Sequence, residues 1–287
     1  MVYLCLSILT ASLIFVVFKL FDRFKVQTFY AIIANYFVAC SVGLIFYNGD
    51  IDLTKIPREP WFLGTLLLGV LFIVVFNLMA ATAQRVGVSV ASVATKMSLA
   101  IPVLFGVIMY NEVLGPIKIF GIILALGAVY FASNKGDSLV IKKSTFLLPL
   151  GVFLGSGIID TSIKYIQETY IQENEYPIFS ATVFAIAAVT GIVFIFINAF
   201  KKPLRFNLKN ILGGIALGVP NYFSIFFLLK ALKNDTLNSA SIFTINNVAI
   251  VMLTTLLGIL LFKEKISGKN WLGIALAVIS ILLVAFF

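Results

Sequence analysis

The chain has 287 residues, of which 61% are hydrophobic and 11% are charged, and its mean hydropathy is +1.09. Soluble globular domains carry about 25% charged residues, so this composition excludes a soluble fold and predicts a protein surrounded by lipid. The net charge of +9 comes from Lys and Arg residues gathered in short loops between apolar runs, which is typical of a membrane surface and excludes a nucleic-acid-binding patch. There is no His, and Cys5 and Cys40 lie inside apolar runs, so we expect no metal site, no cofactor and no disulfide framework.

Ten apolar runs are long enough to cross a bilayer, which takes about 20 residues per helix. The loops between them reach only about a dozen residues and are rich in turn-forming residues, so the sequence leaves no room for a soluble catalytic domain. The first run lacks the basic start and the small-residue cleavage site of a signal peptide, and we expect it to be retained as a helix. The runs cover residues 2–21, 27–47, 60–83, 88–110, 114–133, 145–166, 177–199, 209–232, 237–262 and 267–287.

An internal repeat joins the two halves of the chain. Glu112 and Glu264 each end an apolar run, and each is followed nine residues later by a glycine, Gly121 or Gly273, that opens the next run. Both the glutamates and the glycines are 152 residues apart. A long repeat within membrane-length apolar segments is typical of secondary transporters, in which the substrate site lies between the halves.

The repeat divides the chain into residues 1–133 and residues 145–287, joined by a linker at 134–144. Each half contains five runs, and five is an odd number, so halves that fold alike must have opposite orientations in the membrane. If the N-terminus lies inside, the inward loops hold five Lys and Arg residues and the outward loops hold fourteen. The positive-inside rule therefore favours both termini outside.

The two Glu-centred junctions, each with its following glycine, resemble the drug/metabolite transporter (DMT) superfamily, specifically its EamA-like ten-helix branch, with one domain per half. The resemblance implies an all-α integral membrane protein of ten transmembrane helices, with a central cavity lined mainly by helices 1, 3, 4, 6, 8 and 9. It also implies export or exchange of small metabolites without ATP, and both termini in the cytoplasm, which conflicts with the charge distribution. The sequence departs from the family pattern at Thr254, which stands 152 residues after Pro102 where a second proline is usual, so the two halves are not expected to bend equally.

Four ionisable residues lie inside apolar runs or at their borders. Lys96 is eight residues inside its run, too deep to reach the surface easily, so it either faces a cavity or pairs with a neighbouring helix for packing. Asp160 and Lys164 are spaced i, i+4 on one helical face, where they either neutralise each other or take part in proton coupling. Lys164 and Lys19 are close enough to run ends to extend to the membrane interface.

Neutral polar residues gather in the same runs, which favours a shared polar cavity, although hydrogen bonds between helices would also satisfy them. Pro220 precedes one of them, Asn221, and this pair is expected to form a bend or gate. The candidate substrate-cavity residues are Lys96, Asn77, Ser92, Thr95, Asn221, Tyr222, Asn246 and Asn247.

The repeated residues themselves are interpreted as structural. Glu112 and Glu264 sit at helix ends, where a carboxylate near the N-terminus of the next helix interacts favourably with its dipole. Gly121 and Gly273 are expected to be close-packing positions between helices.

The sequence contains no nucleophile–base pair, phosphate loop or metal-ligand cluster, so we expect no enzyme. The predicted function is a secondary transporter that moves small organic metabolites across the cell (inner) membrane by alternating access, as a facilitator or a proton antiporter. The alternatives are a flippase for lipid-linked substrates and a non-transporting membrane scaffold. Expected partners are a small-molecule substrate, the lipid bilayer and, in the antiport version, protons; no nucleic acid is expected, and the chain is expected to be a monomer or a weak homo-oligomer.

The nature of the cargo depends on Lys96. An uncompensated Lys96 in a low-dielectric cavity would attract an anion, because Coulomb attraction grows as water is excluded. We then expect a substrate with a carboxylate, oriented by Lys96 together with Asn77, Ser92 and Asn221. If burial leaves the Lys96 amine uncharged, neutral or zwitterionic solutes, including amino acids, become the better prediction.

Overall fold

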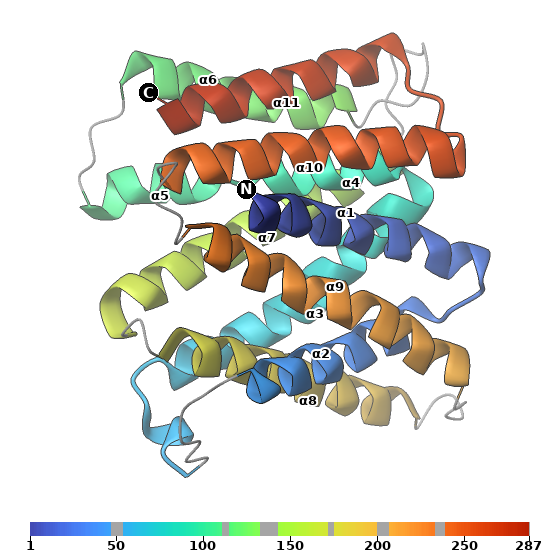
Figure 1. Ribbon diagram of the computed structural model, residues 1–287, viewed down its shortest axis with the longest axis vertical. Coiled ribbons are helices and arrows are strands. Elements are labelled where there is room, and N and C mark those ends of the chain that lie inside the picture. The colour runs from blue at the N-terminus through green and yellow to red at the C-terminus, as the bar shows by residue number, and fades with distance from the viewer. Residues whose placement is uncertain are drawn as a thin grey trace.

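The computed structural model describes residues 1–46, 54–110, 115–132, 143–171, 175–199, 207–232 and 239–286. Within these ranges all regular structure is helical, and long helices lie side by side in a layered bundle (Figure 1). The helices are α1 Val2–Arg23, α2 Thr28–Ile45, α3 Phe62–Arg85, α4 Val88–Met97, α5 Ala100–Tyr110, α6 Pro116–Ala132, α7 Lys143–Tyr170, α8 Tyr176–Ala199, α9 Leu208–Leu232, α10 Ser239–Phe262 and α11 Gly268–Phe286, with a short 3₁₀ turn at Ile56–Arg58.

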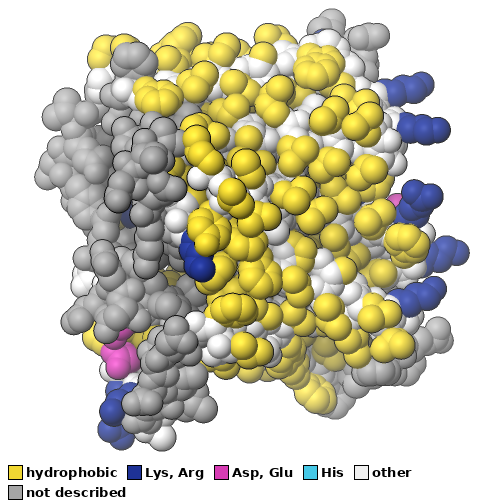
Figure 2. Space-filling model, viewed as in Figure 1, with side chains coloured by type: hydrophobic (Ala, Val, Ile, Leu, Met, Phe, Trp, Pro, Cys, Tyr) yellow, Lys and Arg dark blue, Asp and Glu magenta, His cyan; other side chains and the backbone are white. Residues whose placement is uncertain are grey.

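The described helices form eight membrane-length segments and two shorter apolar ones. Eight described segments are long and apolar enough to cross a membrane, and one of these, Val88–Phe105, combines α4 with the start of α5. Two shorter apolar helical segments, Ile119–Ala132 and Gly268–Val284, belong to α6 and α11. The face shown in Figure 2 is mostly hydrophobic where it is described, as lipid contact requires. The predicted all-α membrane protein with ten spanning segments is confirmed.

The helices that correspond in the two halves run antiparallel where they meet. In the α6–α11 pair, Gly121 of α6 lies against Val284 near the end of α11, whereas Gly273 near the start of α11 lies against Ala132 at the end of α6. In both positions an added Cβ would collide with the partner helix. The prediction that Gly121 and Gly273 are close-packing positions is therefore confirmed.

The same relation holds for α2 with α8 and for α4 with α10. Gly191 late in α8 packs against Ile33 early in α2, and Ser92 early in α4 is hydrogen-bonded to Thr254 late in α10. The contacts between the halves show the same symmetry. α1 of the first half packs on α9 of the second, and their counterparts α7 and α3 also pack on each other. This arrangement is that of two inverted repeats, as the odd number of helices per half requires.

One end of the bundle is rich in cations and will be called the basic end. Here α1, α3 and α10 end, and α2, α4, α9 and α11 begin. Hydrogen bonds join these helix ends: Lys19 donates to the Gln84 carbonyl at 2.8 Å, and Asn210 bonds with Gln27 at 2.9 Å. Lys and Arg side chains project along the corresponding edge of the molecule in Figure 2.

Candidate substrate site

The site is built around an interruption in the fourth membrane-spanning segment. α4 ends at Met97 and α5 begins at Ala100. Pro102 has no backbone N–H to donate to the carbonyl four residues earlier, that of Ser98. The Ile101 N–H instead donates to the Ser98 carbonyl at 2.9 Å, in the tighter i to i−3 pattern. The helix therefore breaks just before the proline.

The corresponding helix in the second half is unbroken. Thr254 stands where the first half has Pro102, and α10 runs continuously past it from Ser239 to Phe262. Its hydroxyl donates to the Ile250 carbonyl at 2.7 Å, which satisfies it within the helix. The expectation that the two halves do not bend equally is confirmed at this position.

Close approach of α7 brings a carboxylate to the break. Gly157 of α7 lies so near Ile101 that any Cβ at this position would overlap the isoleucine side chain. Three residues further along α7, Asp160 accepts a hydrogen bond from the Ser98 hydroxyl at 3.2 Å. The same hydroxyl reaches the Thr95 carbonyl at 2.6 Å, so its one hydrogen is divided between a carbonyl and the carboxylate.

Lys96 is the electrostatic partner of Asp160. The two charges attract each other across the α4–α7 contact, and Lys96 is partly buried. The sequence pairs Asp160 with Lys164 on its own helix, whereas packing of α4 on α7 also brings Asp160 into electrostatic interaction with Lys96. Lys164 is partly buried one turn away and has interactions of its own.

Asp160 lies on the side of α7 that faces away from its most exposed apolar residues. The lipid-facing side of α7 is marked by Leu147, Leu154 and Ile158, with exposed fractions of 60%, 47% and 48%. Each residue turns an α-helix by about 100°, so Asp160 lies about 200° round the helix from Ile158. Asp160 is nevertheless exposed. Ionisable residues on the side of a membrane helix that faces away from lipid are typical of transport pathways.

The other candidate residues of the first half bond mainly to neighbouring backbone. Asn77 donates to the Ile73 carbonyl at 2.7 Å and Thr95 donates to the Ala91 carbonyl at 2.9 Å. Ser92 is fully buried and bridges to Thr254 of the other half, with 2.6 Å between the hydroxyl oxygens. Thr95 lies one residue before Lys96 and is the candidate nearest to the ion pair in sequence.

The candidates of the second half lie in separate contacts between helices. Asn221 is buried and donates to Asn35 of α2 at 3.2 Å, while Asn246 accepts from Ser7 of α1 at 3.2 Å. Tyr222 stacks with aromatic side chains, including Phe46, and Asn247 is partly buried on α10. For Asn221 and Asn246 the hydrogen bonds between helices are thus observed, while α9 continues through Pro220 as one helix.

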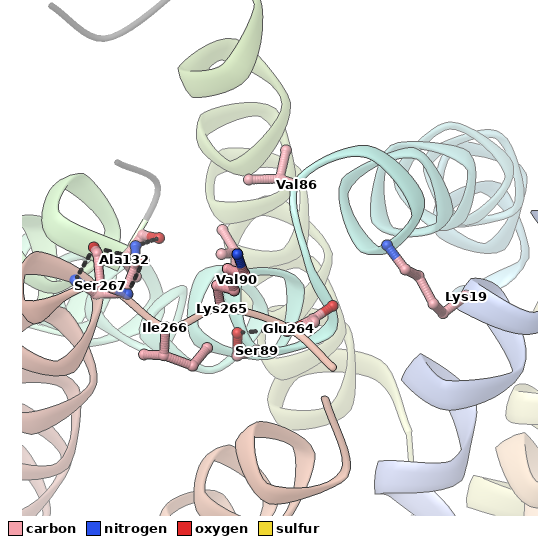
Figure 3. Close-up of a pocket in the computed structure, with 10 residues that line it drawn as sticks. Lys19, Val86, Ser89, Val90, Ala132, Glu264, Lys265, Ile266 and Ser267 are labelled. Carbon is pink, nitrogen blue, oxygen red and sulfur yellow. Dashed lines mark hydrogen bonds between the residues drawn. The ribbon is translucent and has the colours of Figure 1, made fainter. Parts of the chain in front are cut away.

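Glu264 joins the two halves at the basic end. Its carboxylate accepts a hydrogen bond from the Val88 N–H at 2.9 Å and lies 3.4 Å from the Ser89 hydroxyl, so it caps α4 (Figure 3). The expectation concerned the next helix in sequence, α11, whereas the observed hydrogen bonds of Glu264 go to the N-terminus of α4 in the other half. Residues Ser267 and Asn270 bond with each other at the start of α11. Glu112 lies outside the described residues.

Sequence reasoning missed two residues of the site, Ser98 and Gly157. Ser98 could have been found from its spacing, because it stands four residues before Pro102, where the helix loses a hydrogen bond. Gly157 matters only through its contact with Ile101 of another helix, and no local pattern indicates that contact. In the described part of the chain no group of three His, Cys, Asp or Glu side chains is placed to hold a metal ion.

Comparisons with known proteins identify a family and a fold. A family model described as the EamA-like transporter family matches residues 1–134 and 144–286. A relative from Haemophilus influenzae, described as an uncharacterized protein, is 30% identical over 281 residues, which cover 94% of this chain and 93% of the relative. A solved crystal structure resembles this chain with a TM-score of 0.57 at 14% identity, covering 96% of this chain and 95% of the other, which is a likeness of fold alone.

Proposed function

The chain belongs to the EamA-like transporter family, and from this premise we propose that it carries small zwitterionic, amino-acid-like metabolites across the cell (inner) membrane. Members of this family are membrane transporters of the DMT superfamily and not enzymes. This chain is accordingly a multi-pass membrane transporter. Export or exchange by alternating access between the inverted halves is the mechanism that we propose for it.

The observation that carries the choice of cargo is the pairing of Lys96 with Asp160 at the helix break. Each charge is attracted by the other, so a bare anion or a bare cation would interact with one of them and leave the other without a partner in a low-dielectric site. A zwitterion replaces both interactions, because its carboxylate pairs with Lys96 and its ammonium group pairs with Asp160. We therefore favour a zwitterion over the anion expected from an isolated Lys96.

The interrupted helix supports this assignment. Discontinuous helices in transporters expose backbone groups near the bilayer midplane, where they bind substrate. Here the break at Ser98 lies two residues from Lys96 and its hydroxyl contacts Asp160. A substrate bound at this point would contact α4 and α5 of the first half and α7 of the second half. Its binding would therefore affect both halves.

The test is counterflow in proteoliposomes across a panel of zwitterionic, anionic and cationic metabolites. We expect zwitterions to be preferred by the wild type, and we expect Lys96→Met and Asp160→Asn each to reduce zwitterion counterflow by about a hundredfold, as loss of one partner of a desolvated ion pair does. Lys164→Met serves as the matched control on the same face of α7. Preference for cations, or full activity of both variants, would overturn the cargo assignment.

Two further readouts of the same preparation separate the alternatives. Lipid scrambling without metabolite counterflow would show that the protein is a flippase and not a metabolite carrier. Counterflow that ignores an imposed pH gradient, together with an active Asp160→Asn, would exclude proton antiport and leave a facilitator.

A further inference from the structure

The carboxylate of Glu264 is held in a slot made by two glycines, at the place where the two halves meet. A Cβ on Gly87 would lie 3.1 Å from its Oε2 atom and a Cβ on Gly258 would lie 2.7 Å from it. Gly87 has φ +152°, a conformation that side chains disfavour. Both glycines thus keep space for the carboxylate.

The backbone before Glu264 is bent to deliver it. The Glu264 N–H donates back to the Gly258 carbonyl at 3.1 Å. Lys263 has φ +52° and its N–H donates to the Ile259 carbonyl at 3.0 Å, which are the features of a helix end closed by a left-handed residue. This conformation usually falls on glycine, and a lysine in it costs about 1 kcal/mol. Lys263 keeps this unfavourable conformation at the point where the chain leaves α10 and the Glu264 side chain reaches α4.

A second contact between the same helices lies further along α4. The hydroxyls of Ser92 and Thr254 are 2.6 Å apart and fully buried. α4 is therefore a ten-residue half-helix, fastened to α10 at Glu264 and at Thr254 and interrupted beyond Lys96. The free joint is at Ser98 and Leu99, next to the proposed substrate site.

The outer side of this contact borders a cavity. A cavity of about 420 Å³ at the basic end is lined by Lys19, Ser89, Glu264 and Lys265, among others, and Figure 3 shows Lys19 on α1 and Glu264 beside Ser89. A carboxylate at the edge of such a cavity can exchange its bond to the Val88 N–H for water at a small net cost, whereas a sealed one could not. The hydrogen bonds of Glu264 can therefore hold α4 in place, and the adjoining cavity lets them break at a small net cost.

We propose that Glu264 is a latch that keeps the basic end of the carrier closed, and that α4 is the element that moves when the latch opens. Release of the carboxylate would let α4 pivot at Ser98 and Leu99 away from α10, and so open a path from the cavity to Lys96 and Asp160. The inference rests on the proposed alternating-access carrier and adds a gating role for Glu264, the residue that the sequence marks by repetition.

The test measures access to the interface between α4 and α10. Ser92→Cys is introduced in a background with Cys5→Ser and Cys40→Ala, and a membrane-impermeant maleimide is applied to vesicles of both orientations. We expect slow labelling with Glu264 in place. Glu264→Gln, which keeps the size and loses the charge, and Glu264→Asp, which is too short to reach Val88, should accelerate labelling from the basic end about tenfold, as loss of a charged hydrogen bond predicts.

Controls separate a latch from a general loosening of the fold. Glu59→Gln, outside the latch, should leave the labelling rate unchanged, and a thiol at Ala39→Cys, fully buried on α2, should stay protected in Glu264→Gln. Equal labelling of Ser92→Cys with and without Glu264, or a parallel increase at Ala39→Cys, would overturn the latch. Counterflow in the same vesicles reports separately on the carrier itself, so its absence in the wild type would count against the proposed function and not against the latch.

Discussion

At the residue scale, a single missing Cβ lets the last helices of the two halves meet. Gly273 lies against the backbone of Ala128 and Ala132, which cannot move aside as a flexible side chain could. Gly268, five residues earlier, has open space around its Cβ position. We predict that Gly273→Ala lowers the free energy of unfolding by about 1–3 kcal/mol, as overpacking does, while Gly268→Ala changes it little. Thermal unfolding in detergent compares the two, and equal shifts would contradict the packing argument.

Single residues also show where sequence reasoning succeeds and where it ends. The spacing of Gly121 and Gly273 was enough to predict close packing, because small residues in membrane helices are used in that way. The partner of Glu264 could not be predicted, since Val88 lies 176 residues away in sequence. The sequence shows that Lys96 lies deep in an apolar run, but its spacing pairs Asp160 with Lys164 and does not reveal the interaction with Lys96 across two helices. A side chain's type can be read locally, whereas its partner depends on packing.

At the scale of the element, two prolines have different effects. The helix breaks before Pro102, whereas α9 continues through Pro220. Helix ends follow closely from the lengths of the apolar runs, but this difference does not, because a proline interrupts a helix only as far as its neighbours allow. At Pro102 the neighbouring helix is α7. Gly157 lets α7 approach closely, and Asp160 of α7 accepts a hydrogen bond from Ser98.

We predict that Pro102→Ala impairs transport more than Pro220→Ala does. Alanine restores an N–H that can donate to the Ser98 carbonyl, so α4 and α5 would tend to join into one helix. Lys96 and Ser98 would then shift relative to Asp160, and a shift of about 1 Å at a binding site costs up to a hundredfold in rate. Counterflow kinetics should show at least a tenfold fall for Pro102→Ala, and similar losses in the two variants would mean that the break is not needed.

At the scale of the whole molecule, the arrangement of the halves was accessible from the sequence because it follows from counting. Five helices per half force opposite orientations, and the antiparallel pairs α2–α8, α4–α10 and α6–α11 show this relation. Counting does not reveal the direction in which the whole bundle faces. That direction depends on charge, and the structure now shows which charges share an end.

The distribution of Lys and Arg between the two ends predicts how the bundle is oriented in the membrane. Described cations at the basic end include Arg23, Lys25, Arg85, Lys209, Lys263 and Lys265, and those at the other end include Lys55, Arg58, Lys118 and Lys230. Both termini lie at the end away from the basic end, because α1 starts there and α11 finishes there. The positive-inside rule places the basic end in the cytoplasm, so the Glu264 latch would close the cytoplasmic side and both termini would lie outside.

A reporter fused after Phe287 should therefore give an extracytoplasmic signal. In intact cells an impermeant thiol reagent should label Arg58→Cys and spare Arg23→Cys, in a background without the native cysteines. A cytoplasmic reporter signal with the reverse labelling would place the termini inside, as the family resemblance implies. The basic end would then lie outside the cell. The contact between Glu264 and Val88 would be unchanged, but it would close the extracytoplasmic side of the carrier and not the cytoplasmic side.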